Sequence, residues 1–350
     1  MTMRIAIGLA AVLLALTAPM FVYPVFLMKA LCFALFAAAL NLLLGYAGFL
    51  SFGHAALFGG AAYVAGHSMK IWGFPPELGL LTGAATGALL GFGFGALASR
   101  CQGVYFAMVT FALAQLVYFA AVQAPFTGGE DGLQSIPRGH LFGVIDLGPT
   151  LTLYYVILVV FVAAMLAMHR IVHSPFGLVL RTIRDNEPRA VSLGYSSYVY
   201  KVVAFTLSGM LSGLAGAMKT LVFQMATLTD VYWHTNGEVV LMTVLGGIGT
   251  LLGPALGAFI VVAIQSYFAE AGAWVTIIQG VVFVVMVLAF RRGIVGELAA
   301  WFARFRGAAE RAGPNPARSD RDASDRPPDH IMLRRSQVSS QSTKEAQWPN

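Results

Sequence analysis

The sequence predicts an all-α fold, a polytopic transmembrane helical bundle of about 8–10 spans that includes broken or re-entrant helices. Of its 350 residues, 58% are hydrophobic and 11% are charged, and the mean hydropathy is +0.74. So few polar groups do not cover the surface of a soluble globule of this length. Apolar runs near the ~20 residues that a spanning helix needs recur between residues 5 and 290.

These runs are continuously apolar rather than alternating in short blocks, which indicates helices and not a barrel. The first run, 5–23, has the position of a secretory signal, but it is long and lacks a clear cleavage site, so we expect a retained helix. In chain order the runs are 5–23, 25–44, 52–69, 78–98, 104–122, 151–168, 202–223, 239–268 and 274–290.

The distribution of basic residues predicts that one run turns back inside the membrane. If the polar island at 170–201 faces the cytoplasm, Arg4 and Arg100 also fall inside, as basic loops should. Single crossings after the island would leave Arg291 outside. The run 239–268 is interrupted by three glycines and a Gly-Pro pair, so it is expected to form two half-helices or a re-entrant hairpin.

A glycine-dense stretch, residues 45–54, joins the second and third runs. It allows two interpretations: close packing of helices through small residues, or a broken helix beside a transport path. Glu238, at the start of the interrupted run, also allows two interpretations. An ionisable residue near a span is a functional candidate, but a carboxylate at the outer interface is also stabilised by a helix N-terminus.

The island at 170–201 is expected to hold a short exposed helix. Asp185 or Asn186 can cap it, Pro188 fits its first turn, and Gly194 can end it. A helix of about two turns has little stability of its own in water. We therefore interpret the island as a docking surface for a partner at the membrane.

Composition excludes several other functions. The two cysteines encode no disulfide or metal framework, and the seven histidines lack metal-ligand spacing. We therefore expect no catalytic residue, no metal site, no cofactor and no enzymatic activity. The formal charge of +6 marks cytoplasmic segments and not a nucleic-acid site, since half of the 22 Lys and Arg residues follow residue 290.

Several stretches together resemble the inner-membrane permeases of branched-chain amino-acid ABC importers, the LivM-like subunit in particular. The resemblance covers roughly residues 30–290, and its motifs lie at 41–56, 127–133, 181–187 and 237–254. It implies that the island contains the EAA loop, whose helix docks on an ATPase subunit, although Pro188 stands where the family commonly has a small residue. The residues expected to couple to the ATPase are Arg184, Asp185, Glu187, Ala190 and Gly194.

The resemblance also implies partners and a path. The partners are two ABC ATPases that hydrolyse the ATP, a homologous permease subunit, a periplasmic substrate-binding protein and membrane lipid. The path passes the broken helices, with the candidate residues Asn41, Gly48, Ser51, His54, Glu238, Gly246, Gly247 and Gly249. The location implied is the bacterial inner membrane, with a cytoplasmic C-terminal tail.

The expected organisation is a transmembrane permease domain at 1–300, whose coupling loop is 170–201, followed by an interfacial segment and a disordered tail at 301–350. Two other transport functions stay open. A urea or short-amide importer would share the fold and the coupling loop. An ion-coupled secondary carrier would need no ATPase, but the scarcity of carboxylates within the spans counts against it.

Overall fold

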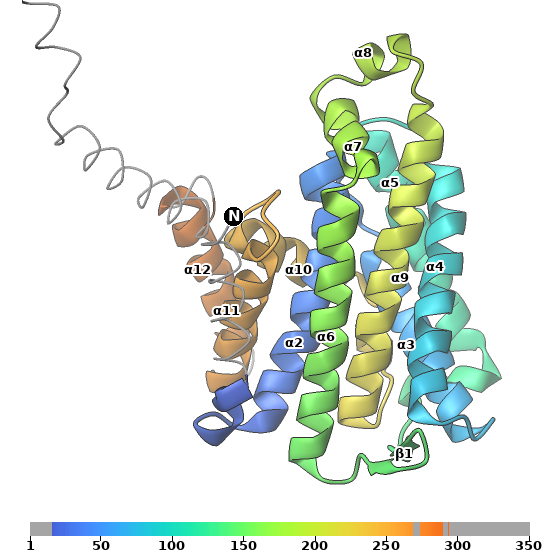
Figure 1. Ribbon diagram of the computed structural model, residues 1–350, viewed down its shortest axis with the longest axis vertical. Helices are drawn as coiled ribbons and strands as arrows, with labels where there is room; N and C mark the ends of the chain where they lie inside the picture. Colours follow the sequence, from blue (N-terminus) through green and yellow to red (C-terminus); the bar gives the residue numbers. More distant parts are fainter. Residues whose placement is uncertain (1–15, 269–273, 290–292, 294–350) are drawn as a thin grey trace, which may run out of the picture. The chain divides into compact units, whose positions relative to one another are not determined.

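The computed structural model describes residues 16–268, 274–289 and 293, and it confirms the predicted all-α bundle (Figure 1). The helices of the first half are α2 (Pro24–Asn41), continued by the π-helical turn η2 (Leu42–Ala47), then α3 (His54–Lys70), α4 (Pro76–Ala98) and α5 (Val104–Gln123). Those of the second half are α6 (Thr150–Val172), α7 (Pro175–Asp185), α8 (Glu187–Ser192), α9 (Ser197–Phe223), α10 (Trp233–Gly246), α11 (Gly253–Tyr267) and α12 (Trp274–Ala289).

Short elements occupy the connections between these helices. Their bounds are η1 (Ala18–Met20), η3 (Pro125–Thr127), η4 (Gly129–Asp131), η5 (Leu228–Asp230), and a two-stranded antiparallel hairpin of β1 (His140–Leu141) and β2 (Ile145–Asp146). The predicted run 5–23 lies mostly outside the described residues, and so do the predicted interfacial segment and tail at 301–350.

Within the described residues, five helices are long and apolar enough to cross a membrane, namely Pro24–Ala47, α4, α5, α6 and α9. The run 239–268 is divided between α10 and α11, as its glycines predicted. Gly293, which follows α12, lies close to the connection between these two helices. The closeness is evident because a Cβ added to Gly293 would collide with the backbone of Gly247. The run thus forms two separate helices, α10 and α11, while its turn within the membrane stays a prediction.

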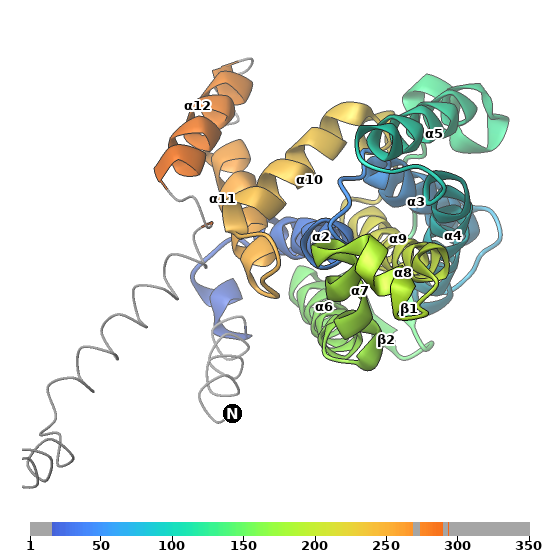
Figure 2. The same cartoon turned by 90° about the horizontal axis from the view of Figure 1, so that it is seen from above.

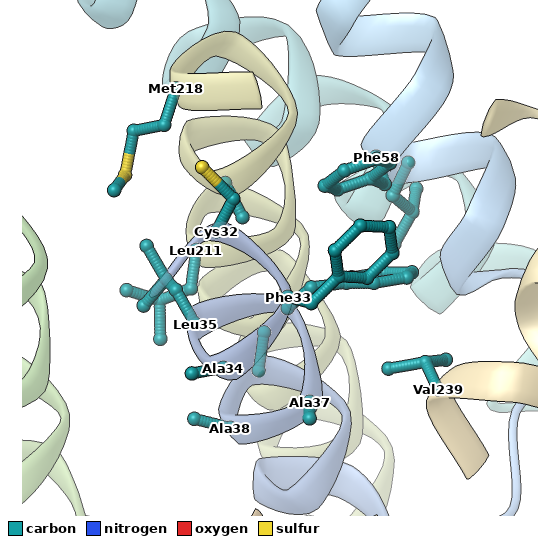
Figure 3. Close-up of a cluster of buried hydrophobic side chains, with 14 of the residues drawn as sticks. Cys32, Phe33, Ala34, Leu35, Ala37, Ala38, Phe58, Leu211, Met218 and Val239 are labelled. Atoms are coloured by element: carbon teal, nitrogen blue, oxygen red, sulfur yellow. The ribbon is translucent and has the colours of Figure 1, made fainter. Parts of the chain in front are cut away.

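Helix α2 forms the centre of the bundle. It packs against α6, α9, α10 and α11 (Figure 2), and its residues from Cys32 to Asn41 are all buried. A helix that is apolar on every side is typical of such a position. Figure 3 shows part of the buried cluster, in which the rings of Phe36 and Phe58 stack with centroids 4.4 Å apart. Cys32 is a small buried residue here, as expected.

Helices α4 and α9 pack side by side through glycine (Figures 1 and 2). A Cβ on Gly87 would collide with the backbone of Gly209 and Gly213, and one on Gly91 would lie 2.7 Å from the carbonyl oxygen of Phe205. Small residues that let two backbones approach are the usual contact between membrane helices. The glycines that recur every four residues from Gly83 to Gly95 are thus explained by packing against α9.

The two ends of the bundle differ. Helices α7 and α8 lie at one end and the β1–β2 hairpin at the other (Figure 1). At the hairpin end, the loops after α5 and after α9 are joined by backbone pairing. The amide of Leu133 donates to the Ala226 carbonyl at 3.0 Å, and the reverse bond measures 2.9 Å. These loops therefore form one connected surface opposite α7 and α8.

Candidate functional site

The polar island folds into two helices, α7 and α8, which together with Leu193 and Gly194 we call the coupling unit (175–194). Asn186 caps α8, since its Oδ1 accepts from the Arg189 amide at 3.0 Å. Asp185, the other predicted cap, is instead the last residue of α7. Gly194 has a φ of +88° just beyond α8, which is the left-handed conformation expected after a helix end.

Sequence analysis missed α7. Its signal was present, because Val179, Leu180 and Ile183 follow helical spacing and are all buried. Ser174 also accepts from the Gly177 amide at the N-cap, with Pro175 at the first helical position. A helix with this few apolar residues is difficult to recognise beside spans that are apolar throughout.

Glu187 fastens α8 to α9. One oxygen, Oε1, accepts from Lys201 Nζ and from Ser197 Oγ, both at 2.5 Å. The Lys201 side chain is only 3% exposed, and its ammonium lies 4.6 Å from the centre of the Phe49 ring. A charge this deeply buried requires its partner. Glu187 is therefore held inward by contacts with α9 of the same chain.

Ala190 is also held inward. It is fully buried and forms a small apolar cluster with Val179 and Ile183 of α7. The outward surface of the unit carries other side chains, among them Val191 and Leu193, which are 54% and 64% exposed. The residues implied to couple thus separate into anchors, Glu187 and Ala190, and an exposed apolar surface that sequence reasoning did not single out.

The ion pair predicts that the coupling unit loosens in acid. Burial alone raises the pKa of the Glu187 carboxyl, but hydrogen bonds from Lys201 and Ser197 and the Lys201 charge outweigh it and lower the pKa below 4.5. A carboxyl whose pKa is lowered by folding contributes stability above its ordinary pKa, and this is lost as pH falls through the lowered value. A spin label on Ser192→Cys, in a Cys101→Ser background, should gain mobility across that acid range. With Glu187→Gln the label should be mobile at every pH, and a transition that persists in this variant would contradict the assignment.

Arg184 connects the coupling unit to the end of α2. Its Nη1 donates to the Gly45 carbonyl oxygen at 2.6 Å, while Nε and Nη2 both donate to Asp185 Oδ1 at 3.1 Å. Gly48, with a φ of +80°, lies against the Arg184 side chain, and a Cβ there would collide with Arg184 Cγ. Arg184 and Gly48, predicted for two different roles, are thus neighbours.

The connection between α10 and α11, residues 247–252, is the tip of a helical hairpin. Asn41, which is fully buried, donates from Nδ2 to the Thr250 carbonyl at 2.7 Å, and its Oδ1 accepts from the Gly249 amide at 2.9 Å. Gly247 and Gly249 have φ of +118° and +77°, which glycine adopts readily. Asn41 therefore satisfies backbone groups freed by the break, as irregular backbone at membrane depth requires.

Ser51 and His54 lie where the chain enters α3. Ser51 Oγ accepts from the Gly53 amide at 3.2 Å. His54 is fully buried, with Nε2 2.8 Å from Ser208 Oγ, and the Ser208 hydroxyl in turn donates to the Ala39 carbonyl at 2.6 Å. Since a hydroxyl has one proton to donate, His54 Nε2 donates to Ser208. This chain joins α3 and α9 to α2.

Glu238 of α10 contacts α11, the other helix of the helical hairpin. Its Oε1 accepts from Gln265 Nε2 of α11 at 2.8 Å and lies 3.7 Å from His234 Nδ1. Glu238 is the sixth residue of α10 and its side chain is 18% exposed, so it is not a first-turn carboxylate. Sequence analysis missed Lys29, a half-buried lysine of the central helix α2. A single lysine in an apolar run was the available signal.

The predicted path residues do not meet at one place. Gly48 lies against Arg184 and Ser51 lies at the entry to α3, as described above, and the others fall into two groups. Asn41, Gly246, Gly247 and Gly249 meet at the hairpin tip, where a Cβ on Gly246 would collide with Gly253. His54 belongs to α3 and Glu238 to α10, and the two side chains do not share a contact. Asn236 joins these two helices, since its Oδ1 accepts from the Ala55 amide at 3.2 Å. The residues that the structure describes hold no group of three potential metal ligands.

Comparison with known proteins shows the family of this chain. The family of branched-chain amino acid transport system permease components matches residues 24–290. The chain is 25% identical over 284 residues to the high-affinity branched-chain amino acid transport system permease protein LivM of Escherichia coli K12, which covers 73% of this chain and 66% of LivM. The match thus spans just under two thirds of that relative.

Permeases for other substrates are also similar to this chain. The ribose import permease RbsC of Bacillus subtilis 168 is 28% identical over 193 residues, covering 53% of this chain and 57% of RbsC. The autoinducer 2 import permease LsrC of Klebsiella pneumoniae is 28% identical over 200 residues, covering 54% and 52%. With the family match extending over most of its length, and five helices among the described residues long and apolar enough to cross a membrane, this chain belongs to the branched-chain amino acid transport permease family as a multi-pass membrane protein.

Proposed function

We propose that the chain is the membrane-spanning subunit of an ABC importer for branched-chain or related hydrophobic amino acids. The observation that carries this proposal is the coupling unit. It is anchored to the bundle through Glu187 and Ala190 and exposes Val191 and Leu193 outward. An exposed apolar patch at the end of a helical bundle is typical of a docking site for another protein.

In this proposal, partner ATPases bind the exposed side of α8 and transmit their motion on nucleotide binding to the spans. Anchored residues suit this role, because a helix that is tied to α9 by a buried ion pair moves with α9. The ATP is hydrolysed on the partners, and the permease chain itself catalyses no reaction. The path runs beside the broken backbone at Asn41, His54 and Glu238.

The partners follow from the same proposal. They are two ATPase subunits, a homologous permease subunit that completes the transmembrane pair, and a periplasmic binding protein that delivers substrate. The proposed docking site of the binding protein is the connected surface at the end of the bundle that carries β1 and β2, where Leu133 pairs with Ala226. This arrangement places the chain in the bacterial inner membrane, with the coupling unit and the C-terminal tail in the cytoplasm.

A charge placed on the docking surface tests the coupling. Leu193→Glu is expected to lower ATP-driven leucine uptake at least about tenfold, because burying an unpaired carboxylate in an interface costs more than ~1.4 kcal/mol. Membrane insertion and thermal stability should not change. Leu193→Met, which keeps an uncharged apolar side chain at the same exposed position, is the matched control and should retain uptake. Deletion of residues 181–194 should abolish uptake, and uptake that survives this deletion would disprove the coupling.

Substrate competition separates this importer from its alternatives. Unlabelled isoleucine and valine should displace labelled leucine, whereas urea, short amides and ribose should not. Uptake that survives ATP depletion but stops when the proton gradient is collapsed would instead indicate an ion-coupled carrier.

A further inference from the structure

Three segments that are distant in the sequence meet around Arg184. They are the end of α7, the π-helical turn η2 that ends α2, and the hairpin tip 247–252. Arg184 binds the Gly45 carbonyl of η2, and Asn41, just before η2, binds Gly249 and Thr250 of the tip. The Arg184–Gly45 pair is separated by 139 residues, and the Asn41–Thr250 pair by 209.

These segments are in van der Waals contact as well as hydrogen-bonded. A Cβ on Gly45 would collide with Asn41 Oδ1 and would lie 2.5 Å from the Gly249 nitrogen. A Cβ on Gly249 would lie 3.4 Å from the Gly45 oxygen and 3.8 Å from Arg184 Nη1. Closely packed groups without voids transmit displacement instead of absorbing it. A movement of Arg184 therefore reaches the tip through one glycine.

The chemistry of Arg184 suits a mechanical connection. Its guanidinium donates to Gly45 with one nitrogen and to Asp185 with two, so the planar group is held in one orientation. Hydrogen bonds from a charged donor are about twice as strong as neutral ones. Asp185 is 68% exposed, which leaves this orienting carboxylate accessible from the side where a partner would dock.

We infer that Arg184 and Asn41 are positioning residues that tie the coupling unit to the hairpin tip, so that the motion of α7 and α8 opens or closes the break between α10 and α11. The inference rests on the proposed function for its meaning in transport. It differs from the docking proposal because neither residue needs to touch the ATPase. Loss of either one uncouples the tip from the coupling unit while the partners still bind.

The first experiment compares uptake with ATP hydrolysis in the complete transporter in proteoliposomes. Arg184→Ala and Asn41→Leu are expected to retain ATP hydrolysis and lower leucine uptake about tenfold, a change on the scale of one charge-assisted hydrogen bond. Arg184→Lys keeps a donor for Gly45 and should restore part of the uptake. Arg100→Ala, which removes an exposed arginine just after the end of α4, should change neither rate. Equal falls in uptake and hydrolysis, or no fall in uptake, would overturn the inference.

The second experiment needs no transport. Amide hydrogen exchange is measured on the full-length chain in lipid nanodiscs, and Arg184→Ala is expected to accelerate exchange in segment 247–252. Asn41→Asp keeps the acceptor for the Gly249 amide, so it should accelerate exchange less than Asn41→Leu. If amides of segment 247–252 exchange as slowly in Arg184→Ala as in the wild type, the inference is wrong, even if ATP-dependent uptake is confirmed. If the wild type shows no ATP-dependent uptake, the proposed function fails, and the exchange result alone decides the connection.

Discussion

Replacing Gly87 by valine is expected to prevent α4 from packing against α9 and to lower the yield of folded protein severely. At Gly87 an added Cβ would collide with the Gly209 carbonyl oxygen and would lie 2.7 Å from Gly213 Cα. Both obstacles are backbone atoms, which cannot rotate away as a side chain can. Overpacking usually costs about 1–3 kcal/mol, and a forced separation of two helices should exceed that range. Thermal unfolding and size-exclusion chromatography in detergent measure the effect.

The same helix supplies the control for this prediction. At Gly93 nothing lies within 4 Å of an added Cβ. Gly93→Val should therefore change the free energy of unfolding by no more than about 0.5 kcal/mol, as ordinary surface substitutions do. Both substitutions add the same side chain to the same helix. If they lower stability equally, the effect arises from valine in a helix and not from contact with α9.

Replacing Lys219 by methionine is expected to destabilise the hairpin end of the bundle by about 3–5 kcal/mol, the usual result of removing one partner of a buried ion pair. Lys219 Nζ binds Asp230 Oδ2 at 2.5 Å, and the two side chains are only 12% and 8% exposed. Asp230 also accepts from the Thr227 hydroxyl and amide at 3.0 and 3.3 Å. Without Lys219, the carboxylate remains buried without its counter-ion. Thermal unfolding in nanodiscs measures the loss.

A double replacement distinguishes charge from packing. In Lys219→Met with Asp230→Asn, no charge remains buried, and the amide can still accept from Thr227. This variant should be more stable than Lys219→Met alone, because the cost of the uncompensated carboxylate is gone. A double variant that is less stable than either single variant would show that the ion pair is not the main interaction at this position.

The spans could be predicted from sequence because their signal is local. Each apolar run carries its length and composition in consecutive residues, and α2 through α6 begin and end near the predicted bounds. The break between α10 and α11 was equally visible, since Gly246 and Pro254 interrupt an apolar run. Positive φ at Gly247 and Gly249 is the structural form of that interruption.

The contacts of the candidate site could not be predicted in the same way. The interactions of Asn41 with Thr250 and of Arg184 with Gly45 join residues more than a hundred positions apart, and many glycines and asparagines in the sequence are equally plausible partners. Lys219 illustrates the same limit. Its partner Asp230 lies beyond the end of α9, where the chain turns back, so nothing near Lys219 in the sequence identifies the pair. Pairings of this kind depend on the path of the chain in three dimensions.

The pairing of Leu133 with Ala226 has an evolutionary consequence. Both hydrogen bonds join main-chain atoms, so their strength is almost independent of the side chains on the two loops. A surface built on such a scaffold can exchange its recognition residues one at a time and keep its shape. If the binding protein docks on this surface as proposed, related permeases can diverge to accept different delivery proteins without redesigning the bundle beneath.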